Sequence, residues 1–232
     1  MRIAMWSGPR NLSTAMMYSF LARGDCAVQD EPFYAAFLHS TGLNHPMRDD
    51  ILASQEIDPR IVGQNCAADI PDGQPHLYLK LMTHHMLADF PMDWTTGFTH
   101  VHLLRHPARV IASYVAKREN PTLEDIGFPQ QLRLFQQLGG VVIDSYDIRA
   151  NPGPTLEKLC DVIGLPFIAK MLTWSAGPRA EDGVWARHWY HAVHASRGFA
   201  AAEGSLPDVP EESAALLKDA MEIYSELQVH KL

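Results

Sequence analysis

Two stretches of the sequence carry residue types suited to binding oxyanions, and the first lies close to the N-terminus. Residues 7–14 join a short apolar run to a segment with helical periodicity. Their sequence is SGPRNLST, which includes Gly8, Pro9, Asn11 and Leu12. A turn at this junction would place backbone N–H groups, the Ser13 and Thr14 hydroxyls and the Arg10 guanidinium at the positive end of a helix. The stretch therefore predicts an anion site, and an ordinary strand-to-helix turn with a Ser/Thr cap is the alternative.

The same stretch does not match the P-loop that holds nucleoside triphosphates. That motif requires Gly, four residues, and then Gly-Lys-Ser/Thr. Counted from Gly8, the second glycine and the lysine fall on Ser13 and Thr14. The sequence therefore disfavours a Mg²⁺-bound triphosphate as the anion.

A second anion-binding pair is predicted in HVHLLRHPARVIASY. Arg105 ends a strand-like run, Pro107 can begin a helix, and Ser113 follows Arg105 by eight residues, about two helical turns. Both predicted anion sites would lie at the carboxyl ends of strands, where open α/β sheets bind ligands. A ligand with two phosphate-like groups would explain both.

Strand-like and helical runs alternate along the chain and predict a three-layer α/β/α fold with a central, mainly parallel sheet, similar to that of P-loop NTPases. We expect one domain over residues 1–232, with an insertion around residues 36–75 that lies over a ligand site and contains short helices near 47–54 and 60–68. The expected strands are 2–6, 26–29, 76–82, 98–104 and 141–146, and the expected longer helices are 11–23, one from Pro32, 107–118, 154–163 and 208–228.

Composition limits the classes of partner and compartment. The net charge of −8 disfavours nucleic acid and anionic membranes as partners, and a homodimer is left open. The three cysteines, Cys26, Cys66 and Cys160, fit neither a disulfide framework nor a zinc knuckle, so we expect buried thiols in a reducing compartment. The apolar start is too short for a signal peptide and no run has membrane-spanning length, so we expect a cytoplasmic protein.

The two anion motifs resemble those of the sulfotransferases that use 3′-phosphoadenosine 5′-phosphosulfate (PAPS). Arg10–Thr14 is similar to the family's 5′-phosphosulfate loop, Lys/Arg-Ser-Gly-Ser/Thr-Thr, with Leu12 in place of the glycine. Arg105, Pro107 and Ser113 are similar to its Arg-x-Pro…Ser element for the 3′-phosphate. The resemblance implies PAPS as the donor, adenosine 3′,5′-bisphosphate (PAP) as the product, and no metal.

Two later stretches extend the resemblance. Residues 145–167 look like the family's acidic strand end, Asn/Asp-Pro, helix and Gly-Leu-Pro, and DGVWARHWY resembles its Gly-x-Trp segment. The latter implies nucleotide contacts from Gly183, Trp185 and Arg187. Ser145 stands where animal cytosolic members have a tyrosine near adenine, so Trp6 or Trp185 is expected to stack on the base instead.

The resemblance also offers competing candidates for the general base that the acceptor requires. Glu31, in DEPFYAAF, resembles the Gly-Glu-Pro element of bacterial carbohydrate sulfotransferases and is favoured, because the first loop also uses arginine as that branch does. His84, in KLMTHHML, resembles the Lys-Thr-His of the cytosolic branch, with His85 beside it; counted from Lys80, however, the base position falls on Met82. Lys80 is a candidate for neutralising the leaving group.

The sequence also admits other functions. His188, His191 and His194 recur at three-residue steps, but no nearby carboxylate or cysteine completes a ligand set, so no metal site is expected. A metal-dependent nucleotide phosphotransferase and a non-catalytic nucleotide-binding module are the alternatives to sulfuryl transfer. The acceptor is expected to be a small molecule in a pocket lined by segments 36–75 and 117–138.

Overall fold

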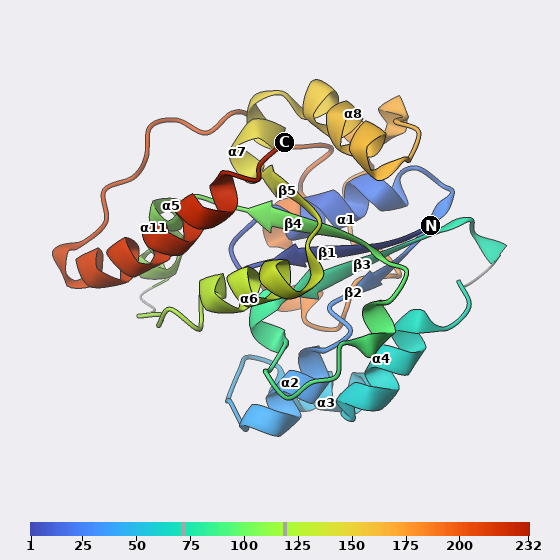
Figure 1. The fold of residues 1–232 in the computed structure, drawn as a ribbon, viewed down its shortest axis with the longest axis horizontal. Coiled ribbons are helices and arrows are strands. Elements are labelled where there is room, and N and C mark those ends of the chain that lie inside the picture. Colours follow the sequence, from blue (N-terminus) through green and yellow to red (C-terminus); the bar gives the residue numbers. More distant parts are fainter. Residues whose placement is uncertain (71–72, 118–119) are drawn as a thin grey trace.

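A five-stranded parallel sheet forms the centre of the protein (Figure 1). The structure, a computed structural model, describes residues 1–70, 73–117 and 120–232. The strands stand in the order β2-β3-β1-β4-β5, and all four neighbouring pairs are parallel. Their bounds are β1 Arg2–Ser7, β2 Cys26–Asp30, β3 His76–Met82, β4 Thr99–Leu104 and β5 Val141–Asp144.

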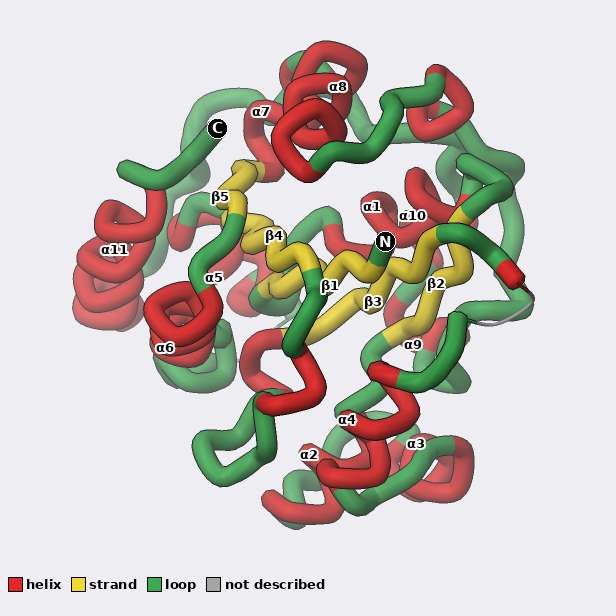
Figure 2. Tube along the Cα trace, turned by 45° about the vertical axis from the view of Figure 1, so that its right-hand side comes forward, coloured by secondary structure: helices red, strands yellow, loops and turns green. Residues whose placement is uncertain are grey.

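Helices cover both faces of the sheet, because both faces of its strands are apolar. In β1, Ile3 and Met5 pack on one side, and Ala4 and Trp6 pack on the other. Figure 2 shows the sheet between the two helical layers, which confirms the predicted three-layer α/β/α architecture. One layer contains α1 (Ser13–Leu21), α7 (Ser145–Ala150) and α8 (Pro152–Ile163), and the other contains α2 (Tyr34–Thr41), α4 (Pro59–Ala67) and α6 (Phe128–Leu138).

A third apolar cluster covers the β5 edge of the sheet. It joins α5 (Pro107–Val115) and α11 (Ala214–Gln228) to α6. None of the described helices is long and apolar enough to cross a membrane. The remaining helices are α3 Arg48–Ser54, α9 Ala186–Trp189 and α10 His191–His194, with short 3-10 turns at Thr83–His85, Asp93–Thr95, Ala169–Leu172 and Glu211–Ser213.

Several predicted boundaries move for local reasons. The first helix begins at Ser13 instead of residue 11, because Arg10 has a left-handed backbone with φ 56° and residues 8–12 form a loop. The last strand ends at Asp144 instead of Tyr146, because the Asp144 carboxylate accepts the Tyr146 N–H at 2.8 Å and begins α7. The helix predicted over 107–118 ends at Val115, and Arg118 lies outside the described residues.

The carboxyl ends of the strands gather loops from distant parts of the sequence. A Cβ at Gly8, directly after β1, would lie 2.8 Å from the Ile126 carbonyl oxygen, so only glycine lets these two backbones approach. Gln131, on α6, donates to the Leu103 carbonyl at 3.0 Å. The first loop and segment 120–131 therefore form adjoining walls at this edge of the sheet.

Candidate functional site

A cavity of about 700 Å³ opens at the carboxyl ends of the central strands. The predicted anion site at residues 7–14, called the anion loop below, contributes Pro9, Arg10, Asn11, Ser13 and Thr14, whereas Gly8 and Leu12 are not among the lining residues. Leu12 packs against the core beneath α1. Both segments expected near the acceptor also contribute, from Phe37 to Pro46 and from Asn120 to Gln130; residues 71–72 and 118–119 of those segments lie outside the described chain.

The anion loop is held in place by side chains on either side of it. The Asn11 amide donates to the Leu103 carbonyl at 3.0 Å and ties the loop to β4. The Arg10 guanidinium lies 5.0 Å from the centre of the Tyr114 ring and 5.2 Å from that of the Trp189 ring, within the range of cation–π contact. A cation, two hydroxyl-bearing residues and the first-turn amides of α1 thus face one end of the cavity.

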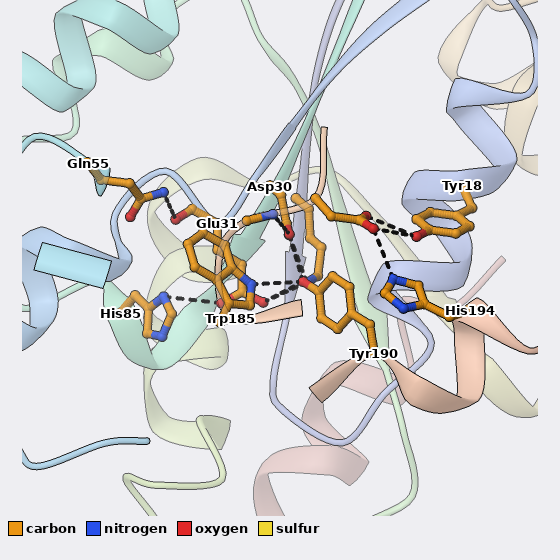
Figure 3. A network of polar contacts seen from close by, with 11 residues as sticks. Tyr18, Asp30, Glu31, Gln55, His85, Trp185, Tyr190 and His194 are labelled. Atoms are coloured by element: carbon orange, nitrogen blue, oxygen red, sulfur yellow. Dashed lines mark hydrogen bonds and ion pairs between the residues drawn. The ribbon is translucent and has the colours of Figure 1, made fainter. Parts of the chain in front are cut away.

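A buried cluster of charges lies beside this loop (Figure 3). Asp30 pairs with Lys80 in the register of β2 with β3, and Glu31 follows Asp30 directly. The Lys80 ammonium donates to Asp30 Oδ1 at 2.9 Å and to Glu31 Oε1 at 2.5 Å. It also contacts the Tyr190 hydroxyl, which donates to the Asp30 carboxylate at 2.8 Å. Sequence reasoning named Glu31 and Lys80 separately but missed Asp30 and Tyr190.

The protonation states of the cluster follow from burial and from its mixed charges. Burial raises the pKa of Glu31, and the Lys80 ammonium opposes that rise. Burial acts to lower the pKa of Lys80, but the carboxylates of Asp30 and Glu31 outweigh it and the pKa is raised. Burial and the same carboxylates raise the pKa of Tyr190 well above its ordinary value. Lys80 is therefore charged and Tyr190 neutral at pH 7, and Glu31 is the group of the three nearest to exchanging a proton.

The backbone at Glu31 is in an unusual conformation. Its φ is 41°, in the left-handed region that a residue with a side chain rarely adopts. The Glu31 N–H donates to the Lys80 carbonyl at 2.9 Å, and the Gln55 amide donates to the Glu31 carbonyl at 3.1 Å. Strain of this kind persists where surrounding contacts fix it, often at functional sites. Glu31 lines the cavity, so this strained backbone lies at the candidate site.

The neighbouring histidines differ from Glu31 as proton acceptors. His84 and His85 both line the cavity, and His85 Nδ1 lies 4.0 Å from Glu31 Oε2. Burial lowers the pKa of His84 to about 3 and that of His85 well below its ordinary value. Both imidazoles are therefore neutral and weakly basic near pH 7.

The second predicted anion pair is not brought together at the cavity. Neither Arg105 nor Ser113 is among the lining residues. Arg105 instead contacts the Arg10 carbonyl and donates to Glu203 Oε1 at 2.7 Å. Ser113 lies on α5, half-buried.

Gly183, Trp185 and Arg187 of the late Gly-x-Trp segment are not among the residues that line the cavity, and the first two support the charge cluster instead. The Gly183 N–H donates to Asp30 Oδ2 at 3.1 Å, and the Trp185 indole donates to the Tyr190 hydroxyl at 3.0 Å. Arg187 pairs with Asp50 near the surface. Trp185 is 1% exposed and Trp6 is completely buried, so the structure contradicts the expected stacking of adenine on either indole.

Two other aromatic rings line the cavity where Arg10 lies. Trp189 and Tyr114 both do so, and sequence reasoning assigned neither to the site. The histidines next to Trp189 are engaged elsewhere: His188 packs edge-on against the Trp189 ring, and His194 bonds Asp182 at 2.9 Å. Over the described part of the chain, no group of three or more His, Cys, Asp or Glu side chains is placed to hold a metal ion.

The chain belongs to the sulfotransferase domain family, whose model, described as "Sulfotransferase domain", matches residues 1–231. Among curated proteins, "Branched-chain-amino-acid aminotransferase-like protein 2" and "protein 1" of Arabidopsis thaliana are 34% and 35% identical to it over 236 residues. The match covers 98% of this chain but 41% and 42% of theirs, so the chain spans about two fifths of the length of these relatives.

Solved structures are also similar over most of the chain. The "Sulfotransferase Domain from the Curacin Biosynthetic Pathway" is 18% identical, covers 97% of this chain and 96% of its own, and has a TM-score of 0.49. A retinol dehydratase in complex with androsterone and inactive cofactor PAP is 11% identical, covers 99% of this chain and 81% of its own, and has a TM-score of 0.43.

Proposed function

We propose that the chain transfers a sulfuryl group from PAPS to a hydroxyl or amine of a small-molecule acceptor. The observation that carries this proposal is that one cavity joins two chemically different walls. Arg10, Ser13 and Thr14 face it from the N-terminus of α1, and the buried Glu31–Lys80 pair faces it from the ends of β2 and β3. Membership of the sulfotransferase domain family supports a phosphosulfate group as the anion at the first wall.

The anion loop would bind the phosphosulfate end of the donor. PAPS supplies an activated sulfuryl group, and charge develops on the departing 5′-phosphate as the group is transferred. The Arg10 guanidinium, the two hydroxyls and the first-turn amides of α1 are fixed donors for that charge. Such donors need no metal ion to stabilise a leaving phosphate.

Glu31 would accept the proton that the acceptor loses. As the acceptor oxygen or nitrogen bonds to sulfur, the bond from sulfur to the 5′-phosphate oxygen breaks and its electron pair stays on the phosphate. Burial raises the pKa of Glu31 toward the working pH, which strengthens it as a base. Lys80 orients the carboxylate through the contact to Oε1, which leaves Oε2 on the side of His85.

The remaining walls favour a largely apolar acceptor. Phe37, Leu43, Met82 and Leu87 line the cavity beyond the charge cluster, next to the neutral imidazole of His84. An apolar alcohol or amine would bury its body against these side chains and present its nucleophile to Glu31.

Turnover of ³⁵S-labelled PAPS with a panel of small alcohols and amines tests the proposal. We expect labelled product without added metal, and a loss of about 10²- to 10⁴-fold in Glu31→Gln, the usual worth of a general base. Glu157→Gln removes an exposed carboxylate of α8 that does not line the cavity and is the matched control, with near-normal turnover expected.

Other outcomes would support other interpretations. Unchanged turnover in Glu31→Gln would transfer the base role to His84 or His85. Magnesium-dependent ATP turnover would favour the phosphotransferase, and PAP binding without any turnover would favour a non-catalytic module.

A further inference from the structure

Three arginines from different elements surround one buried glutamate. Arg105 and Arg149 each donate to Glu203 Oε1 at 2.7 Å, and Arg109 Nε lies 3.0 Å from Oε2. Arg105 directly follows β4, Arg109 belongs to α5 and Arg149 belongs to α7. The Glu203 side chain is 3% exposed although its neighbours Ala202 and Gly204 are exposed.

The backbone around Glu203 is held by the same arginines. Arg149 Nε donates to the Ala201 carbonyl at 2.8 Å, and Arg109 contacts the Gly204 carbonyl. The apolar anchors of this connection lie outside it: Phe199 packs on Trp174, and Val209 packs on the cluster that covers the β5 edge. Residues 200–206 can therefore leave the arginines without uncovering a core.

We propose that Glu203 is an internal anion that occupies the arginine cluster in the free protein and is exchanged for the 3′-phosphate of the bound nucleotide. Arg109 and Arg149 then join Arg105 in binding that phosphate. This inference rests on the proposed function, in which PAPS is the donor, and on the resemblance of Arg105 to the family's 3′-phosphate element.

The charges of the cluster favour such an exchange. Three guanidinium groups contact one carboxylate, so the contacting side chains keep a net charge of about +2. A phosphate monoester carries about −1.5 to −2 at pH 7 and offers three acceptor oxygens, which matches three arginines better than the two oxygens of a carboxylate. The Arg105 and Arg149 side chains are 22% and 21% exposed, so an incoming anion can reach them.

Arg105 also connects the cluster to the first anion site. Besides contacting Glu203, its guanidinium contacts the carbonyl of Arg10 in the loop that faces the cavity. One side chain thus touches both the loop assigned to the 5′ end of the donor and the carboxylate that stands where a second anion would bind. A nucleotide that carries only a 5′-phosphate has no group to displace Glu203.

Calorimetric titration with PAP and with adenosine 5′-phosphate tests the exchange. In Glu203→Gln we expect PAP to bind at least tenfold more tightly, because the competing charge is gone, while the affinity for adenosine 5′-phosphate changes less than twofold. Glu211→Gln, which removes an exposed carboxylate from the same C-terminal connection, should match the natural protein for both ligands. Arg149→Ala should reduce the preference for PAP over adenosine 5′-phosphate at least tenfold.

Hydrogen exchange of the natural protein supplies a second readout that needs no substitution. Saturating PAP should speed exchange of the amides of residues 200–206 if Glu203 is displaced. If the natural protein binds PAP but Glu203→Gln binds it equally or more weakly, the exchange is wrong and the proposed function stands. Slower hydrogen exchange of residues 200–206 in the presence of PAP would likewise overturn the exchange alone. If neither the natural protein nor Glu203→Gln binds PAP, both the exchange of Glu203 and the proposed function are wrong.

Discussion

Replacement of Lys80 by methionine probes the buried charge cluster most severely. The Lys80 and Asp30 side chains are each 1% exposed and that of Glu31 is 10% exposed, so solvent screens these charges little. Removing one partner of a buried ion pair costs about 3–5 kcal/mol, because the other charge is left buried and unpaired. Lys80 neutralises two carboxylates, so we expect Lys80→Met to lose about 4 kcal/mol in the free energy of unfolding at pH 8.

The loss should depend on pH with a definite sign. Burial already raises the pKa of Glu31 above its ordinary value of 4.5, and the Lys80 ammonium is the main influence that lowers it. A carboxyl group whose pKa is raised by folding stabilises the fold fully below its unfolded pKa and loses that contribution as the pH rises. Without Lys80 the pKa rises further, so the variant should be penalised less at pH 5 than at pH 8.

Urea unfolding of the natural protein and of Lys80→Met at pH 5 and pH 8 measures both quantities. The double variant Asp30→Asn with Lys80→Met removes one of the two stranded carboxylates and should recover at least 1 kcal/mol at pH 8. A loss below 1 kcal/mol at pH 8, or an equal loss at both pH values, would refute the assignment of a buried charged cluster.

Three further predictions concern the nucleotide, the base and the loop. Arg105→Ala should weaken PAP binding at least tenfold more than adenosine 5′-phosphate binding in calorimetry, and equal losses would reject its assignment to the 3′-phosphate. The rate of sulfuryl transfer should fall as the pH drops through the raised pKa of Glu31, because the protonated carboxyl cannot accept a proton; a pH–rate profile flat down to pH 4 would contradict this. Gly127→Ala should cost about 1–3 kcal/mol in urea unfolding, because φ is +76° and the new Cβ would lie 2.7 Å from Thr83 Oγ1; a cost below 0.5 kcal/mol would show that the loop adjusts freely.

The sheet could be predicted from the sequence because its strands are short apolar runs at regular intervals. Residues 76–82 are buried on both faces of β3, and their run of bulky side chains is typical of a parallel strand between helices. The turn after β1 could also be predicted, because it depends on residues adjacent in the chain: a strand, a Gly-Pro pair and a helix that begins with Ser and Thr.

The contacts that complete the site depend on tertiary structure. Glu31 and Lys80 were both predicted as candidates, but their pairing follows from the position of β2 beside β3, which no local pattern specifies. Tyr190 and Glu203 come from irregular C-terminal segments without hydrophobic periodicity. Trp185 carries the sequence signal expected of a nucleotide contact, yet its indole bonds Tyr190 inside the protein.

The proposed function requires that the chain bind a nucleotide phosphorylated at both ends, without a metal ion. Calorimetric titration with PAP and with ATP, each with and without Mg²⁺, tests it most directly. We expect PAP to bind more tightly than ATP and Mg²⁺ to leave the PAP affinity unchanged. Binding of ATP that requires Mg²⁺ and exceeds that of PAP would contradict it.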